Sequence, residues 1–333
     1  MKKESIRIFA LILVLAMAFA VVGCGSTEPA VKTGGTQTGT EASGTEAVST
    51  EGHYKIGLSI SDKSLPFFGV IESVIREKIE ANGDTLVAVD AGNDLQTQIN
   101  QIEDLIAQDI DILLLIPRDN KGVLPALVAC KDAGIPVISV DQEPFDTEYL
   151  TSHVASDNYD CGKVIGTHMA KILPEGSKIL VIQASFAESI TNRVKGMKEA
   201  AEAAGVTYDY IDVEYTGDQE PLTLIEDALQ ANSDLDAIYG PYEAFSLAAA
   251  AAVQSARLNI PVFGVDASPS EKAAIKEGAI TATAAQSPYK IGDQVIITVY
   301  DVLKGVEVEN RYLIPSFIVD ANNVDEYGTT DWQ

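Results

Sequence analysis

Side chains able to bind a ligand gather just after the ends of the predicted strands. Ser61, Phe67 and Phe68 follow the first strand, and Asp141 and Gln142 follow a later one. Similar positions in the second half of the chain hold further polar and aromatic residues: Glu188, Thr191, Tyr215, Asp218, Tyr242, Glu243, Asp266 and Gln286. Aromatic rings cover the apolar face of a sugar, while carboxylates and amides bond its hydroxyl groups. This set of side chains is typical of carbohydrate binding.

The two adjacent phenylalanines lie in the first turn of a helix predicted to begin at Pro66. Proline suits that turn because it has no amide hydrogen, and the first amides of a helix have no partner. Neighbouring helix positions point about 100° apart, so Phe67 and Phe68 cannot both face the same core. We expect at least one ring to point out of the carboxyl end of the sheet, where open α/β sheets bind ligands.

Acidic residues in such loops also have a simpler explanation, since many of them cap the following helix. Capping is the favoured interpretation for three of the acids: Glu188, Asp218 and Glu243. Asp141 differs, because Gln-Glu-Pro follows it and no helix begins there. Asp266, followed by Ala-Ser-Pro, fits either a helix cap or a ligand acceptor.

The sequence shows no signature of catalysis or metal binding. Its three histidines lie far apart, and it contains no zinc pattern, nucleophile elbow or Walker lysine. We therefore predict no enzymatic activity, no cofactor and no metal. An enzyme stays open as an alternative, since Asp141 and Asp266 could act as an acid–base pair on a glycoside. Cys130 and Cys161 fall in predicted helices; buried thiols are favoured over a disulfide, which stays possible outside the cytoplasm.

The first 53 residues are predicted to be an export signal followed by a flexible tether. A basic start precedes an apolar run, 8–22, that is too short for a comfortable membrane span. Small residues before Cys24 resemble a lipoprotein signal, with 1–23 removed and lipid on Cys24 anchoring the chain to the bacterial cell membrane. The alternative is an ordinary signal peptide or anchor with an incidental cysteine. Residues 24–53 are mostly Ser, Thr, Gly, Glu and Ala, which predicts a flexible tether.

From Tyr54 onward, predicted strands and helices alternate. Strands are expected at 55–60, 85–90, 112–116, 136–140, 178–182, 207–213, 237–239, 260–265 and 280–285, with an extended stretch at 312–319. Helices are expected from residue 66 and at 95–108, 122–133, 159–173, 188–204, 220–231, 244–256, 269–277 and 288–303. The pattern restarts near residue 157, which indicates two similar α/β domains, each with a mainly parallel sheet between helix layers.

The net charge of −26 argues against nucleic acid as a partner.

Several motifs follow one another within residues 54–320: KIGLSISDKSLPFFGVIESV, PVISVDQ, SHVASDNYDCGKVIG, VFGVDASPSEKAAI and TATAAQSPYKIGDQV. In this order they resemble the ribose-binding-protein type of ABC-transporter solute-binding protein. The resemblance implies a periplasmic-binding-protein type I fold: two doubly wound parallel-sheet lobes, joined by a three-strand hinge, that close on a ligand. It places the N-terminal lobe at 54–156 plus 288–315 and the C-terminal lobe at 158–286 plus 316–330.

The same resemblance implies which residues bind the ligand. The predicted set is Ser61, Phe67, Phe68, Asp141, Gln142, Thr191, Tyr242, Asp266 and Gln286. Gln142 and Thr191 stand where ribose binders have arginines, and Tyr242 replaces an asparagine. Each lost arginine removes charge-assisted bonds worth ~1.5–3 kcal/mol, so a ligand other than ribose is expected. Arg193, close to the second lost arginine, is interpreted as structural.

The predicted function follows from these features. We expect an extracytoplasmic, lipid-anchored and monomeric protein that binds a sugar or polyol in the interlobe cleft and delivers it to an ABC permease. One alternative is an autoinducer-2-type receptor. The proline of Gly240-Pro241-Tyr242 resembles those receptors, which also have an aspartate matching Asp141, although they lack the Phe-Phe turn. Another is a sensor that presents its ligand to a chemoreceptor or histidine kinase.

Overall fold

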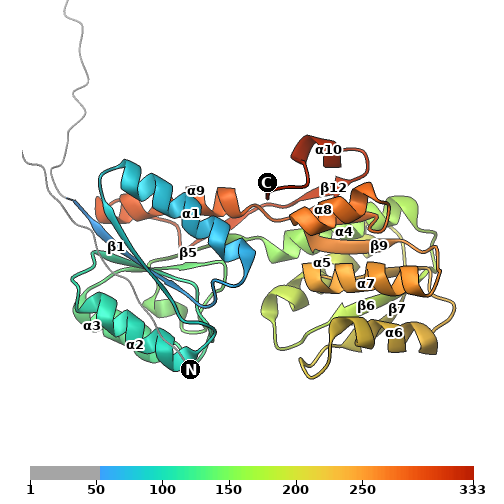
Figure 1. Ribbon diagram of the computed structural model, residues 1–333, viewed down its shortest axis with the longest axis horizontal. Coiled ribbons are helices and arrows are strands. Elements are labelled where there is room, and N and C mark those ends of the chain that lie inside the picture. The colour runs from blue at the N-terminus through green and yellow to red at the C-terminus, as the bar shows by residue number, and fades with distance from the viewer. Residues whose placement is uncertain (1–52) are drawn as a thin grey trace, which may run out of the picture. The chain divides into compact units, whose positions relative to one another are not determined.

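Two six-stranded sheets organise residues 53–333, the part of the chain that the computed structural model describes (Figure 1). The first sheet has the order β11-β5-β4-β3-β1-β2, and all its strand pairs are parallel. Its strands are β1 (Lys55–Ile60), β2 (Thr85–Asp90), β3 (Ile112–Leu115), β4 (Val137–Val140), β5 (Ser152–Ser156) and β11 (Arg311–Ile314). With the helices packed on it, this sheet forms the first lobe.

The second sheet repeats this arrangement with the order β12-β10-β9-β8-β6-β7. Its strand pairs are parallel except that β12 runs antiparallel to β10. The strands are β6 (Lys178–Gln183), β7 (Asp209–Glu214), β8 (Ala237–Tyr239), β9 (Val262–Asp266), β10 (Ala282–Ala285) and β12 (Phe317–Asp320). This sheet and its helices form the second lobe.

Helices cover both faces of each sheet (Figure 1). The first lobe contains α1 (Pro66–Ala81), α2 (Leu95–Ile106), α3 (Leu124–Ala133), a 3-10 turn (Thr147–Tyr149) and α9 (Pro288–Leu303). The second contains α4 (Asn158–Ile172), α5 (Glu188–Ala203), α6 (Pro221–Ala231), α7 (Glu243–Ser255), α8 (Pro269–Lys276) and α10 (Val324–Tyr327).

The central strand β3 explains why helices must lie on both sides of the first sheet. Its sequence, ILLL, is fully buried along its length. Ile112 and Leu114 belong to a core cluster shared with α1 and α9, whereas Leu113 and Leu115 belong to another cluster shared with α2 and α3. Because successive side chains of a strand point to opposite faces, an unbroken apolar run requires an apolar partner on each face.

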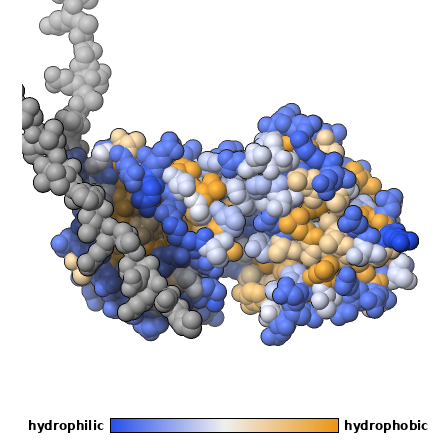
Figure 2. All heavy atoms as spheres, in the orientation of Figure 1, coloured by the Kyte–Doolittle hydropathy of each residue, from blue (hydrophilic) through white to orange (hydrophobic). Residues whose placement is uncertain are grey.

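Figure 2 shows orange and tan residues spread over one face of the second lobe, in the region where Figure 1 labels α7 and α8. The five alanines Ala248–Ala252 lie in α7, and three of them, Ala249, Ala250 and Ala252, are buried. Their small side chains let α7 pack against the neighbouring α6 and β9.

The chain passes between the two sheets three times: from β5 to α4, from β10 to α9, and from β11 to β12. Two features of these links differ from the sequence prediction. Strand β5 was not predicted, and the extended stretch predicted at 312–319 consists of two strands, β11 and β12, which belong to different sheets and are separated by Pro315 and Ser316. Both strands are stabilised by pairing with strands far away in the sequence, which local patterns do not show.

The other predicted elements are present, with ends that differ by a few residues. Helix α3, for example, begins at Leu124 and not at residue 122. The Asp119 carboxylate accepts hydrogen bonds from the backbone N–H groups of Lys121 (2.9 Å) and Gly122 (2.7 Å), which holds those residues in a turn.

Helices α4 and α5 pack unusually closely through glycines. A Cβ atom added to Gly162 would lie 1.8 Å from the carbonyl oxygen of Arg193, and one added to Gly166 would lie 2.2 Å from that of Met197. On the other helix, a Cβ atom at Gly196 would lie 2.1 Å from the carbonyl oxygen of Tyr159. This close contact fixes how α5 lies against α4, and therefore the position of Arg193 relative to α4.

The remaining predictions on export and cysteines have different outcomes. The signal peptide, Cys24 and nearly all of the tether lie in residues 1–52, outside the described residues. Between residues 53 and 333, no helix is both long and apolar enough to cross a membrane. Cys130 and Cys161 are both buried free thiols, as favoured from the sequence, and burial raises the pKa of each, to about 12 and about 11 respectively.

Candidate ligand-binding site

Asp141 and Asp266 each stand at the carboxyl end of a strand, one in each lobe. Asp141 follows β4 and has φ 63°, while Asp266 ends β9 and has φ 122°. Positive φ is uncommon for residues other than glycine, and such strained positions cluster at functional sites. Ala267, with φ 52°, continues the unusual backbone path after Asp266. The backbone at both strand ends is therefore bent in a way that the local sequence does not favour.

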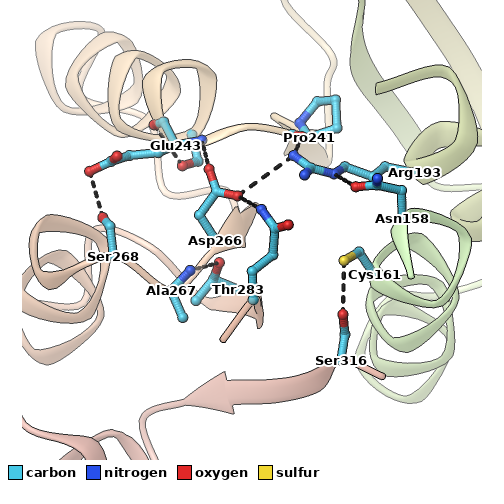
Figure 3. A network of polar contacts seen from close by, with 12 residues as sticks. Asn158, Cys161, Arg193, Pro241, Glu243, Asp266, Ala267, Ser268, Thr283 and Ser316 are labelled. Atoms are coloured by element: carbon cyan, nitrogen blue, oxygen red, sulfur yellow. Dashed lines mark hydrogen bonds and ion pairs between the residues drawn. The ribbon is translucent and has the colours of Figure 1, made fainter. Parts of the chain in front are cut away.

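A buried polar network surrounds Asp266 (Figure 3). The residue is 3% exposed, and its Oδ2 accepts a hydrogen bond of 2.9 Å from the backbone N–H of Glu243. Its Oδ1 accepts a hydrogen bond from the Gln286 side-chain amide and lies 3.6 Å from a guanidinium nitrogen of Arg193. Gln286 is itself 6% exposed. Two predicted site residues, Asp266 and Gln286, are thus in direct contact.

Arg193 is the residue of this network that the sequence prediction missed. It comes from α5 and is buried; its Nε donates to Asn158 Oδ1 at 2.9 Å and its NH1 to the Pro241 carbonyl at 3.0 Å. Its role includes the structural one expected, because it ties α4, α5 and the loop before α7 together. It also holds the positive charge nearest to Asp266. The available signal was its position on the buried stripe of α5, between Ile190 and Met197, where a charged residue is unusual.

Burial raises the pKa of both carboxyl groups, and Arg193 opposes the rise in each. Removal from solvent raises the pKa of Asp141 to about 6; the positive charge of Arg193 opposes this rise, and the negative charge of Asp266 adds to it. Burial also raises the pKa of Asp266, and Arg193 with the hydrogen bonds from Glu243 and Gln286 opposes that rise. One arginine therefore acts electrostatically on a carboxylate of each lobe. Among residues 53–333, no hydrogen bond reaches the half-buried Asp141 side chain, and its part in ligand binding stays a prediction.

The Phe-Phe turn places its two rings in different surroundings. Phe68 is 4% exposed and packs in the core cluster beneath α1 and α9, while Phe67 is half-buried. The Phe67 ring centroid lies 6.1 Å from that of Phe68 and 5.2 Å from that of Trp332, in edge-to-face geometry. Phe67 also packs against the core cluster that contains Phe68, so an outward ring at this turn stays a prediction. Ser61 is buried, and its carbonyl accepts a hydrogen bond from the Asn93 backbone.

The remaining predicted ligand residues lie outside the bonded network. Thr191 is exposed, and its hydroxyl bonds to the Ala187 carbonyl one turn earlier, at 3.3 Å. Gln142 is half-buried, next to Asp141. Tyr242 is 37% exposed, with its ring centroid 5.8 Å from that of Phe245. Their contribution to ligand binding stays a prediction.

The capping interpretation of three acids is wrong. Helices α5, α6 and α7 have no side-chain cap, so Glu188, Asp218 and Glu243 do not serve as caps. Glu243 instead accepts a hydrogen bond of 2.5 Å from the Ser268 hydroxyl. Asp266 does not cap α8, since Ser268 caps it in a reciprocal pair with Glu271. Asp266 binds the first amide of α7 from another part of the chain, a contact that sequence spacing does not show.

Comparison with known proteins places the chain in a class and then in a family. Its architecture, two doubly wound α/β lobes joined by three crossings, is that of type I periplasmic binding proteins, as expected. Residues 56–307 match the model of the periplasmic binding protein domain family, and the chain belongs to that family.

Individual relatives agree with this assignment. The chain is 31% identical over 265 residues to the ribose import binding protein RbsB of Bacillus subtilis (strain 168), covering 79% of this chain and 86% of the relative. The crystal structure of an ABC transporter solute binding protein from Mycobacterium smegmatis with bound glycerol is 29% identical, with a TM-score of 0.75, covering 84% of this chain and 99% of that one. A solute binding protein from Bacillus halodurans C-125 with bound myo-inositol is 25% identical, with a TM-score of 0.74, covering 83% and 97%.

Proposed function

We propose that this protein binds a small polyhydroxylated molecule, a sugar or a polyol, between its lobes and delivers it to an ABC permease. The single observation that carries the proposal is the pair of carboxylates at strand ends of the two lobes, Asp141 and Asp266, on which the same buried arginine acts. A ligand that donates hydroxyl hydrogens to both carboxylates would bridge the two lobes. Such a ligand stabilises the closed arrangement because it binds both lobes only there.

The chemistry of the surrounding residues supports a neutral, hydroxyl-rich ligand. Arg193 already contacts Asp266, Asn158 and Pro241, so it is engaged within the protein and does not offer a free fork to an anionic ligand. Phe67 is half-buried and would supply an apolar surface to such a ligand. The relatives named for ribose, glycerol and myo-inositol support the same chemical class. Ribose itself is disfavoured because Gln142 and Thr191 replace two arginines of the ribose-type pattern.

The proposal includes export and attachment to the membrane through lipid on Cys24, which the signal-like sequence supports. The proposal also holds that the protein is a monomer and that its two lobes divide at the three crossings. The protein acts without catalysis, so incubation with glycosides should give no turnover. Turnover abolished by Asp141→Asn would contradict this point. An autoinducer-2-type receptor and a sensor partner are the alternatives, and the ligand panel below includes autoinducer-2 for that reason.

The test is a thermal-shift panel of pentoses, hexoses, polyols and autoinducer-2 on the exported chain without its signal. A true ligand present at 100 times its dissociation constant should add ~2.7 kcal/mol to the free energy of unfolding. A shift with a sugar or polyol supports the proposal, and a shift with autoinducer-2 alone favours the receptor alternative. The proposal is wrong if no carbohydrate or polyol raises the melting temperature.

A further inference from the structure

The segment Asp331–Gln333 lies beyond the family match, which ends at residue 307, and folds back against the links between the lobes (Figure 1). Two side chains hold its first residue. The fully buried Lys272 of α8 donates from Nζ to the Asp331 carbonyl at 2.6 Å, and the Tyr289 hydroxyl of α9 donates to Asp331 Oδ2 at 2.8 Å. A lysine is seldom fully buried without a partner for its charge. The segment, which we call the return segment, is therefore part of the folded structure.

Gln333 joins the return segment to the polar network around Asp266. Its side-chain Nε2 donates to two backbone carbonyls, that of Asp266 at 3.2 Å and that of Gln286. The backbone carbonyl of Gln333 accepts a hydrogen bond from the Ser287 hydroxyl. Its Oε1 is buried and, among the described residues, has no hydrogen-bond partner. A buried acceptor without a donor costs free energy, so a ligand hydroxyl at this place would relieve that cost.

Trp332 carries the return segment across to the first lobe. Its ring centroid lies 5.2 Å from that of Phe67 with an interplanar angle of 73°, and both side chains are half-buried. Each ring therefore keeps free surface beside the other. The contacts described above also hold the segment to Lys272 in the second lobe and to Ser287 and Tyr289 at the start of α9.

We propose that Trp332 and Gln333 complete the ligand site, with Trp332 and Phe67 forming its apolar wall and Gln333 Oε1 accepting a ligand hydroxyl. The inference rests on the proposed function and names residues that determine its specificity. The ligand class is a sugar or polyol that presents a carbon-backed face to the two rings and a hydroxyl to the amide. Phe68, buried in the core, supports Phe67 from behind.

Trp332 makes the test direct because it is the only tryptophan of the chain. The protein is titrated with the sugar or polyol that gives the largest thermal shift, while tryptophan emission and calorimetric heat are recorded. The emission should change and saturate at the same concentration as the heat. Trp332→Ala should weaken binding roughly three- to tenfold, the scale of one lost aromatic contact, and Trp332→Phe should recover part of the loss.

The matched control is Leu258→Ala, which removes an apolar side chain that is 41% exposed after α7. It should leave the affinity unchanged. Unaltered emission together with unaltered affinity of Trp332→Ala would overturn the inference and leave the proposed function intact. Tighter binding by Trp332→Ala would also overturn it, since the return segment would then compete with the ligand. If no sugar or polyol binds the wild-type protein, the proposed function fails and this inference fails with it.

Discussion

Asp141 is the residue whose protonation should change most within an accessible pH range. Burial raises the pKa of its carboxyl to about 6 in the folded protein, whereas in the unfolded chain it has its ordinary value of about 4. Between these two values the folded state holds a proton that the unfolded state has lost. The contribution of Asp141 to stability is therefore fully present below pH ~4 and is lost as the pH rises through 6.

We predict that Asp141→Asn stabilises the ligand-free protein at pH 7 by ~1–3 kcal/mol, because the variant buries no charge there. The gain over wild type should shrink between pH 6 and pH 4. Urea denaturation across that range measures it, and Asp132→Asn, which makes the same change at an exposed position on α3, is the control. A gain that does not depend on pH would contradict the assignment of this titration to Asp141.

Arg193 offers a second test at the same scale. Replacing it by methionine leaves the buried carboxylate of Asp266 and the half-buried carboxylate of Asp141 without the positive charge that acts on both. Breaking a buried pair on one side costs about 3–5 kcal/mol, and we predict a loss of stability of that size. Chemical denaturation at pH 7 measures it. Lys195→Met, at an exposed position of the same helix, should cost less than ~0.5 kcal/mol.

Single residues show where sequence reasoning succeeds and where it stops. The contact between Asp266 and Gln286 agrees with a site read from strand ends, because parallel strands bring their carboxyl ends to one edge. Arg193 was interpreted only as structural, because its contact with Asp266 joins a helix to a strand end 73 residues later in the chain. The predicted cap at Glu243 is wrong for a related reason, because the amide at the start of α7 donates to the carboxylate of Asp266, which comes from another loop.

At the scale of elements, the packing of α4 on α5 positions Arg193. The carbonyl of Arg193 itself lies against Gly162, so any side chain there pushes the two helices apart. We predict that Gly162→Ala destabilises the protein by ~1–3 kcal/mol and also weakens ligand binding. Thermal unfolding and calorimetric titration measure the two effects.

Gly69→Ala is the control for this prediction. Gly69 lies in α1, and nothing lies within 4 Å of a Cβ atom added there. Alanine forms helix more readily than glycine, so this variant should be neutral or up to ~1 kcal/mol more stable. Equal destabilisation by both variants would show that the α4–α5 contact is not special.

Elements also divide into those that local patterns predict and those that they do not. The apolar run of β3 and the helix from Pro66 are strong local signals, and both are present. Strand β5, with the sequence SHVAS, carries a weak signal and is stabilised by pairing with β4 and with β11, which comes about 160 residues later. The local pattern of 312–319 shows one extended stretch, and only the family resemblance places a lobe boundary between 315 and 316, where β11 and β12 separate.

For the whole molecule, the proposed function requires the two lobes to close on the ligand by movement at the three crossings, with no change within either sheet. The third crossing is tied to α4, since the Ser316 hydroxyl lies 2.8 Å from the Cys161 sulfur and the Ser316 amide donates to Asp160 at 3.0 Å. We predict that a saturating ligand reduces the radius of gyration measured by small-angle scattering. An unchanged radius at saturation would mean that binding occurs without closure.

The motif order predicted the family and the two-lobe fold, because those depend on patterns spread over the whole chain. It did not reveal the return segment. Trp332 lies outside all the quoted motifs, and its contact with Phe67 joins residues at opposite ends of the described chain. Contacts of this kind follow from the completed fold and leave no local pattern.

The measurement that tests the central claim most directly is calorimetric titration of the best sugar or polyol into the wild-type protein, Asp141→Asn and Asp132→Asn. The proposed site predicts saturable binding of one ligand per chain to the wild type. It predicts binding at least roughly tenfold weaker for Asp141→Asn, through the loss of a charge-assisted hydrogen bond, and no change for Asp132→Asn. Equal affinity of all three proteins, or no binding by any of them, would contradict the claim that Asp141 binds the ligand between the lobes.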